Sequence, residues 1–266
     1  MKSHKSEPLS KNTLKIYKSL KSKKFRKREN KFIIEGIKMC KEAIHSDYAM
    51  EVLLLHMSSL ASIDVEWFFD HCREHDIPVK QITDKDLATL SDTVNSQGVL
   101  GIVNKPETLV ELLDMKFLLA VDSGRDPGNV GTIIRTADGF GIDAVLLGAD
   151  SVDLYNEKVL RSTMGSIFHI PVVENVDLVQ QLKILKDGGF TIYSSEIQGD
   201  TDYHRHQYSN RKVIIVGNES RGIASDIAAL ADVRLRIPLH GQAESLNMSV
   251  ATGILLSEAV NSYGKQ

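Results

Sequence analysis

The chain has 266 residues, of which 42% are hydrophobic and 25% are charged, with 18 Gly and 6 Pro. This composition is typical of a globular protein and excludes disordered, collagen-like and low-complexity chains. No apolar run approaches the roughly 20 residues that a membrane helix needs. Cys40 and Cys72 are too few for a disulfide framework and are not spaced like a zinc site. We therefore expect a reduced cytoplasmic protein with no membrane partner and no bound metal.

Charge is distributed unevenly along the chain, although the net charge is only −3. Residues 1–31 contain 12 Lys or Arg and 2 Asp or Glu, whereas residues 32–266 contain 20 and 33. A basic segment ahead of an acidic body suggests a polyanionic partner such as nucleic acid. The segment has no apolar core of the kind found in secretory signals, and a merely solubilising tail is the alternative.

The first hundred residues are predicted to form a small α/β domain that follows a basic helix. A rough helical stripe of apolar residues lies within the basic segment: Leu14, Ile16, Tyr17 and Leu20. Strands are then expected at 31–34, 50–55, 78–82 and 98–103, and helices at 36–44 and 84–90. A further helix is expected from Asp64, as its N-cap, to just before Ile77.

The second half alternates between strands and helices more regularly. Strands are expected at 117–121, 143–147, 190–194, 212–217 and 233–237. Helices are expected at 129–140, 156–164, 176–187, 224–231 and 247–262. This alternation predicts a mostly parallel sheet covered by helices on both faces. We divide the chain into a basic arm (1–30), a small domain (31–104), a linker (105–113) and a larger domain (114–266).

Ligands of parallel sheets bind beyond the carboxyl ends of the strands, so we expect chemistry in the loops after residues 121, 194, 217 and 237. The first loop begins at Asp122, and Pro127 and Gly128 are expected to form a tight turn whose following helix start offers free N–H groups to an anion. Arg135 lies about two turns along the same face. A solvated arginine is the alternative, but the helix around it is small and apolar, which favours a function.

Two further loops are polar and rich in glycine. Gly217 and Gly222 bracket the second loop, directly after a buried strand, and can let the backbone approach a ligand closely. The third loop runs from Ile237 to Asn247. Ser245 or Asn247 is a good cap for the helix that follows, and capping by itself explains either residue but not the whole polar loop.

Other familiar sites are not supported. No G-x-G-x-x-G follows a strand, no phosphate-binding P-loop motif exists, and Ser220 is not set in the G-x-S-x-G of a nucleophile elbow. His71 and His75 could share a helical face, but the glutamate of H-E-x-x-H is absent and no third ligand suggests itself. Surface residues are the better interpretation.

Taken together, the three loops resemble the three motifs of the SpoU/TrmH family of RNA 2′-O-ribose methyltransferases, within the SPOUT superfamily. The matching segments are 129–137 with 139–141, 216–222, and 237–238 with 245–251. In the front half, 32–36 and 97–99 resemble the opening and the last strand of the ribosomal-protein-like substrate-binding domain that many members carry. The resemblance covers nearly the whole chain.

The resemblance implies an α/β fold: a parallel-sheet SPOUT domain with a trefoil knot, plus a smaller N-terminal α/β domain that binds the RNA substrate. S-adenosylmethionine would bind in the knot, and members are usually homodimers with the site at the interface. By motif match, the cofactor-binding residues are Gly217, Ile237 and Leu246, and a Cβ at position 217 would block the approach. The same match assigns the polar catalytic set: Arg135, Asn129, Glu219, Ser245 and Asn247.

The resemblance also implies roles and a substrate. Arg135 would hold the target phosphate and the 2′-oxygen, Asn129 would orient Arg135 and the ribose, and the other three residues would complete the pocket. The two-domain layout favours 23S-type ribosomal RNA over tRNA. A catalytically silent RNA-binding ribosome-assembly factor is the rival of a different class, and the presence of all five polar residues speaks against it.

Overall fold

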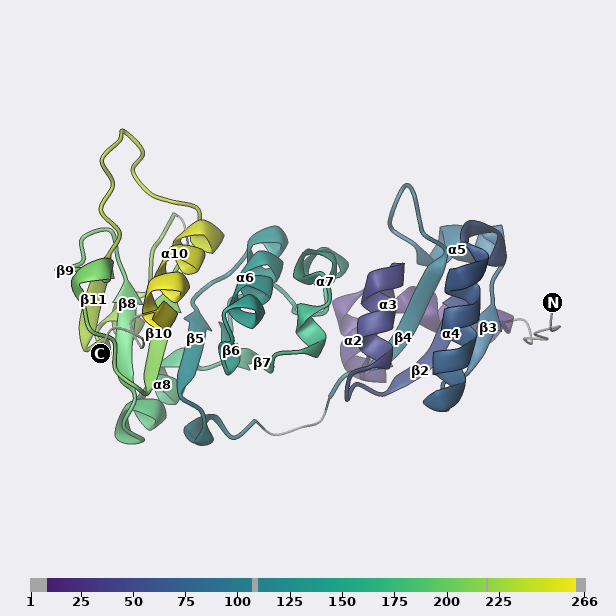
Figure 1. Cartoon of the computed structure of the whole chain (residues 1–266), viewed down its shortest axis with the longest axis horizontal. Coiled ribbons are helices and arrows are strands. Elements are labelled where there is room, and N and C mark those ends of the chain that lie inside the picture. Colours follow the sequence, from purple (N-terminus) through teal and green to yellow (C-terminus); the bar gives the residue numbers. More distant parts are fainter. Residues whose placement is uncertain (1–8, 107–109, 219, 262–266) are drawn as a thin grey trace. The chain divides into compact units, whose positions relative to one another are not determined.

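The computed structural model describes residues 9–106, 110–218 and 220–261, which form two compact units (Figure 1). Among these residues, unit 1 contains 9–106 and 155–168, and unit 2 contains 110–154, 169–218 and 220–261. No helix in the described ranges is long and apolar enough to cross a membrane. The units are described one at a time below.

Unit 1 is built on a four-stranded mixed sheet with the order β1-β4-β2-β3. Its strands are β1 (Lys31–Glu35), β2 (Met50–Leu55), β3 (Val79–Gln81) and β4 (Val99–Asn104). Strand β4 is antiparallel to both β1 and β2, and β3 runs parallel to β2. The helices that follow the strands are α3 (Ile37–Ile44), α4 (Ser62–Glu74) and α5 (Asp84–Leu90). All of these elements lie within a few residues of their predicted positions.

The start of α4 differs from the prediction. The helix begins at Ser62 with Ala61 as the N-cap, so Asp64 lies inside the first turn. There its carboxylate stabilises the positive end of the helix and accepts a 3.0 Å ion pair from Lys41 of α3. A side chain in the first turn and a capping side chain favour the same residue types, which is why the sequence placed the boundary three residues late.

The basic segment is folded from residue 9 onward. It forms α1 (Lys11–Ser19) and α2 (Lys23–Glu29). Tyr17 and Leu20 are buried in the same apolar cluster as Val52 and Leu54 of the sheet. The stripe predicted from the sequence is thus the side of α1 that faces the core, although Ile16 is 44% exposed. Residues 1–8 lie outside the described ranges.

Residues 155–168 also belong to unit 1, although they follow β6 in the sequence. They form α7 (Glu157–Thr163) and a short 3₁₀ turn at Ser166–Phe168. The ring centroids of Tyr155 and Phe32 lie 4.5 Å apart, and Leu160 is buried. Local sequence predicts this helix correctly but not the unit in which it lies.

Unit 2 contains a seven-stranded sheet with the order β7-β6-β5-β10-β8-β11-β9. Every neighbouring pair is parallel, as predicted. The strands are β5 (Phe117–Val121), β6 (Ala144–Gly148), β7 (Val172–Val176), β8 (Thr191–Ser195), β9 (Thr201–Asp202), β10 (Lys212–Val216) and β11 (Val233–Arg236). The two edge strands β7 and β9 were not predicted, because β7 is only partly buried and carries Glu174 and Asn175, and β9 has two residues.

Helices cover both faces of this sheet (Figure 1). They are α6 (Pro127–Gly139), α8 (Leu178–Asp187), α9 (Ser225–Ala228) and α10 (Met248–Asn261). Leu178, Leu182 and Ile227 from α8 and α9 share one apolar cluster with alternate residues of β5, β8 and β10. Helices α6 and α10 pack against each other, and this pairing places the starts of both helices beside the same edge of the sheet.

Candidate active site

The loops singled out from the sequence gather at one edge of unit 2. Strands β5, β10, β8 and β11 are consecutive neighbours and all parallel. Their carboxyl ends therefore lie side by side, and the loops after Val121, Ser195, Val216 and Arg236 leave the sheet together. Ligands of open parallel sheets bind at this edge.

The first loop leads into α6, which begins earlier than predicted. Pro127 is the first helical residue, and the Asp126 carboxylate caps the helix by accepting a 2.8 Å hydrogen bond from the Asn129 N–H. Of the N–H groups expected to be available to an anion at this helix start, that of Asn129 is thus already bound by a side chain of the same loop. Only the backbone N–H of Asn129 takes part in this cap, and its side chain makes the contact with the third loop that is described below.

Arg135 lies two turns into α6, on the exposed side of the helix. No hydrogen bond or ion pair joins its guanidinium to another residue within the described part of the chain. On the next turns, the Thr132 and Thr136 hydroxyls donate to the carbonyls of Gly128 and Thr132, both at 2.8 Å. Arg135 is thus the one cation of α6, and the threonine hydroxyls beside it already donate to carbonyls of the same helix.

The second loop folds back on itself. The Gly222 N–H donates to the Asn218 carbonyl at 2.8 Å, and the Ser220 N–H donates to the Asn218 side chain at 3.0 Å. A Cβ built on Gly217 would lie 2.4 Å from the carbonyl carbon of Gly222. Glycine is therefore required at 217 by the backbone of the loop itself, in addition to any approach by a ligand. Glu219 lies outside the described residues.

The third loop joins β11 to α10 and is the long excursion that precedes α10 in Figure 1. Asn247 caps α10: its side-chain oxygen accepts from the Ser249 N–H at 2.9 Å. Its Nδ2 donates to Oδ1 of Asn129 at 3.0 Å. Two residues that are 118 positions apart thus meet at the starts of α6 and α10. Capping accounts for the Asn247 oxygen but not for its amide nitrogen.

The remaining predicted residues of this loop are less constrained. Ser245 is exposed, and Ile237 and Leu246 are partly buried. Within the described residues, no hydrogen bond engages the backbone between 237 and 246. Free N–H and C=O groups along such a segment are what an adenine edge requires, because a nucleobase can be recognised through backbone donors and acceptors. The loop thus fits an adenosine-bearing cofactor.

The loop after β8 was expected to carry chemistry, but no residue in it was singled out. The Glu196 N–H donates to the Leu235 carbonyl at 2.8 Å, and its carboxylate accepts from Nε of Arg234 at 3.1 Å. The hydrogen bond from Arg234 lowers the pKa of Glu196. A Cβ on Gly199 would lie 2.6 Å from the Leu235 backbone. This loop therefore braces the end of β11, immediately before Ile237.

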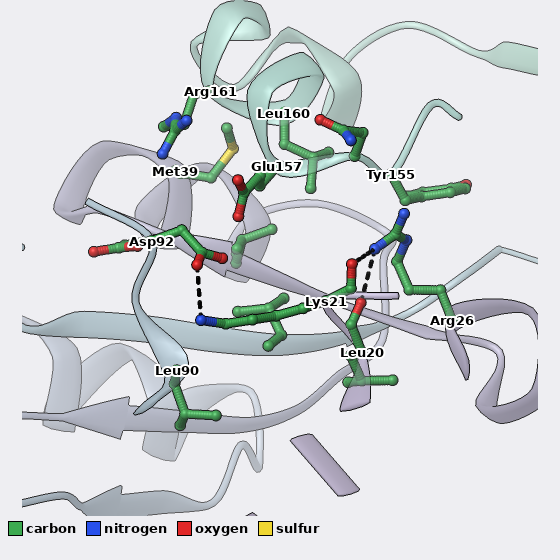
Figure 2. A pocket seen from close by; sticks show the side chains of 14 residues that line it. Leu20, Lys21, Arg26, Met39, Leu90, Asp92, Tyr155, Glu157, Leu160 and Arg161 are labelled. Atoms are coloured by element: carbon green, nitrogen blue, oxygen red, sulfur yellow. Dashed lines mark hydrogen bonds and ion pairs between the residues drawn. The ribbon is translucent and has the colours of Figure 1, made fainter. Parts of the chain in front are cut away.

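A separate cavity of about 240 Å³ lies in unit 1 (Figure 2). Its walls combine apolar and charged side chains from α7, β1 and the turn between α1 and α2. The charges pair with one another: Lys21 Nζ lies 2.8 Å from Asp92 Oδ1, and Arg26 donates to two backbone carbonyls at 2.8 Å. Lys21, Asp92 and Arg26 thus already have partners within unit 1.

Two acidic residues in this cavity share a hydrogen bond. Burial, together with the hydrogen bond and negative charge of Asp92, raises the pKa of Glu157 to about 7. Although burial opposes the change, hydrogen bonds from Glu157 and Lys21 lower the pKa of Asp92. Glu157 therefore keeps its proton to higher pH than an exposed glutamate does, and it shares a hydrogen bond with Asp92.

The histidines of α4 do not form a metal centre. His71 stacks on Trp67 with ring centroids 3.9 Å apart, and its Nδ1 lies 2.9 Å from the Trp67 carbonyl oxygen. In the described ranges, no group of three or more His, Cys, Asp or Glu is arranged to hold a metal ion.

Comparison with known proteins agrees with this geometry. Residues 116–257 match the SpoU rRNA Methylase family, and residues 11–101 match the MRM3-like substrate binding domain. The chain is 35% identical over 243 residues to the Bacillus subtilis 23S rRNA (guanosine(2553)-2′-O)-methyltransferase RlmP, covering 91% of this chain and 94% of that protein.

Solved structures match the chain over nearly its full length. The AdoMet-bound rRNA methyltransferase from Sinorhizobium meliloti is 30% identical, with a TM-score of 0.84 and 97% of each chain covered. A TrmH-family RNA methyltransferase from Porphyromonas gingivalis, described as putative in its structure report, is 30% identical, with a TM-score of 0.80 over 95% of this chain and 98% of that one.

Proposed function

The chain belongs to the SpoU rRNA methylase family of S-adenosylmethionine-dependent RNA methyltransferases, and on that premise we propose that it methylates a ribose 2′-hydroxyl of 23S-type ribosomal RNA. The observation that carries the proposal is the contact between Asn129 and Asn247 at 3.0 Å, at the sheet edge where Arg135 is exposed. A protein that only bound RNA would need positive charge but not this pairing of two distant amides.

The cofactor would be held by the three loops at the carboxyl edge. Gly217, Ile237 and Leu246 would contact it through their backbone groups, which in Ile237 and Leu246 belong to a segment without internal hydrogen bonds. When bound, S-adenosylmethionine supplies a methyl group that its sulfonium already activates. The protein therefore has to align the two reactants, and alignment can contribute about 7–11 kcal/mol.

In the reaction, the ribose 2′-oxygen forms a bond to the methyl carbon while the sulfur–carbon bond breaks and the sulfur keeps the electron pair. The hydroxyl proton must leave in the same step. A charged guanidinium such as that of Arg135 only donates hydrogen bonds and has no lone pair with which to accept a proton. We assign it to the neighbouring phosphate and the 2′-oxygen, so that the phosphate or solvent takes the proton.

The other polar residues would complete this arrangement. Asn129 is tied to Asn247 and would orient the ribose beside Arg135. Ser245 lies two residues before Asn247 on an exposed loop, and we place it with Glu219 in the pocket on the basis of the family motif. A pocket built from exposed loops of this kind is completed by a second copy of the chain, and we propose a homodimer for that reason.

The finer fold assignments are also proposals. We propose that the C-terminal segment of unit 2 threads a loop to form a trefoil knot, as the family membership implies. We retain the division into a basic arm (1–30), an RNA-binding domain of ribosomal-protein type (31–104), a linker (105–113) and a methyltransferase domain (114–266). The protein would work in the cytoplasm, where ribosomal RNA is modified.

The exposed cations of α1 and α2 are the proposed contacts to RNA phosphate. They lie in a segment that matches a substrate-binding domain. The members exposed on the two helices are Lys11, Lys15, Lys18, Lys23, Lys24, Lys27 and Arg28. Because Tyr17 and Leu20 anchor α1 in the core of unit 1, these cations are held on a fixed surface.

The direct test uses the full chain, labelled S-adenosylmethionine, and unmodified 23S rRNA, assembled large subunits or tRNA as acceptors. Nuclease digestion should release labelled 2′-O-methyl nucleotides from 23S rRNA or from the subunit. Label on tRNA alone would favour the tRNA enzyme. If calorimetry detects no binding of S-adenosylmethionine, a catalytically silent RNA-binding factor becomes the favoured function.

A further inference from the structure

Asp122 is a buried acidic residue at the carboxyl end of β5, and it has no role in the assignments above. Asp122 is only 7% exposed, and no Lys or Arg within the described ranges forms an ion pair with it. Burying a carboxylate is costly unless hydrogen bonds compensate for the lost water. The hydrogen-bond partners of the Asp122 carboxylate therefore indicate its role.

The partners of Asp122 lie in the second loop. Its Oδ2 accepts a 2.7 Å hydrogen bond from the Ala224 N–H, and its Oδ1 accepts a 3.0 Å hydrogen bond from the Ser123 hydroxyl. Its own N–H donates to the Val216 carbonyl at 2.9 Å, the last residue of β10. One residue thus contacts the chain immediately before Gly217 and again at Ala224, where the loop ends.

The neighbouring Ser123 holds the same loop at a third point. Its carbonyl accepts from the Asn218 amide at 3.3 Å. Ser123 has a φ of 56°, in the left-handed region that costs energy for a residue with a side chain. Such a conformation persists only where surrounding contacts impose it, and here the contacts run to the loop that contains the proposed cofactor-binding glycine.

We propose that Asp122 is a positioning residue that holds the 217–224 loop in the conformation that binds the cofactor. This inference rests on the proposed function. Residues 122 and 123 accept hydrogen bonds from Ala224 and Asn218 near the two ends of the loop, and the close approach of Gly217 to Gly222 closes it between those ends. The required property is an acceptor at the Ala224 N–H, since no cation accompanies the charge.

Two variants separate the acceptor from the charge. Asp122→Ala leaves the Ala224 N–H without its partner, which should weaken S-adenosylmethionine binding about tenfold. Asp122→Asn keeps an oxygen for Ala224, and the Ser123 hydroxyl can rotate to accept from the new amide. We therefore expect Asp122→Asn to bind the cofactor within about twofold of the natural chain.

A control residue with similar hydrogen bonds lies just before β6, at the opposite end of the sheet, and is exposed where Asp122 is buried. The Asp143 carboxylate also accepts two hydrogen bonds, from the Lys116 and Phe117 N–H groups at 2.8 Å, but it does so at the amino end of β5. Asp143→Ala should lower stability through the same kind of loss and leave cofactor affinity unchanged. Calorimetry measures the affinity, and amide hydrogen exchange over 217–224 measures the loop without any cofactor.

If Asp122→Ala does not fold, Ala224→Pro removes the same hydrogen bond from the donor side. The φ of Ala224 is −58°, which the proline ring permits, and the ring carbon that replaces the amide hydrogen excludes the Asp122 carboxylate from its present position. Weaker binding with faster exchange in the loop supports the proposal. Unchanged affinity in Asp122→Ala and Ala224→Pro, or equal weakening in Asp143→Ala, overturns it. If the natural chain itself binds no S-adenosylmethionine, the proposed function fails instead.

Discussion

The carboxyl edge of the unit 2 sheet and the cavity of unit 1 make an instructive contrast. The cavity is a defined hollow with six charged residues among its lining, yet Lys21 is paired with Asp92, and Arg26 with backbone carbonyls. The edge is open and exposed, yet Arg135 and the backbone of 237–246 have no partners among the described residues. Internal hydrogen bonds hold the helices and strands beside Arg135 and residues 237–246, but they do not engage the Arg135 guanidinium or the backbone of 237–246.

This difference shows how to distinguish a site from a packing defect. A side chain that must bind a ligand has to be positioned by its surroundings and left with bonding capacity. Lys21, Asp92 and Arg26 of the cavity already use their bonding capacity within unit 1, so they stabilise that unit. Asn247 illustrates the other case, because its oxygen caps α10 while its nitrogen holds Asn129.

The largest expected effect is on Arg135. Arg135→Ala should reduce methyl transfer by at least about 100-fold, since it removes a charged contact to the reacting groups. Binding of S-adenosylmethionine should be nearly unchanged, because the cofactor is assigned to other loops. Lys183→Ala, a change at an exposed cation of α8, is the control and should keep full activity. Lost cofactor affinity in Arg135→Ala would contradict the assignment.

The next effect concerns the closed loop after β10. Gly217→Ala should lower the free energy of unfolding by about 1–3 kcal/mol, because the new methyl group would overlap the Gly222 backbone. Urea unfolding measures this change. Gly139→Ala is the matched control, since no atom lies within 4 Å of a Cβ there. Equal stability of the two variants would show that the loop tolerates a side chain.

A smaller effect tests the basic helices. Lys24→Gln with Lys27→Gln should reduce the salt dependence of RNA binding, the slope of log K against log salt, by about 1.4 if both contact phosphate. The paired control is Lys116→Gln with Lys183→Gln, which removes the same charge from exposed positions of unit 2. Substitution is preferable to truncation, because deleting α1 would remove Tyr17 and Leu20 from the core. Equal slopes for both double variants would refute the role of α2.

The smallest effect is in the cavity of unit 1. Because the pKa of Glu157 is raised from 4.5 to about 7, its ionised form is disfavoured in the fold. Stability should therefore fall as the pH rises from about 4.5 to 7, and Glu157→Gln should abolish that part of the dependence. Thermal unfolding at pH 5.5 and pH 8 would reveal it, with a larger gain for the variant at pH 8. Methyl transfer should be unaffected.

Periodicity and turn residues by themselves determined most of the elements and the parallel order of unit 2. Buried strands such as Phe117–Val121 and Lys212–Val216 are apolar runs bounded by polar loops, and such runs are local properties. The positions of Arg135 and Gly217 could be singled out in the same way. The edge strands β7 and β9 were not predicted, because weakly buried strands carry little apolar pattern in the sequence.

Only the tertiary structure decided which residues meet. Asn129 and Asn247 lie 118 positions apart, and Asp122 and Ala224 lie 102 apart, so neither contact has a local signal. The same holds for residues 155–168, which follow a strand of unit 2 and pack in unit 1. Even the reason for glycine at 217 is a contact with the returning backbone of the loop. Short-range sequence sets the conformation of each segment, but packing between distant segments sets which polar groups are satisfied and which are free to bind.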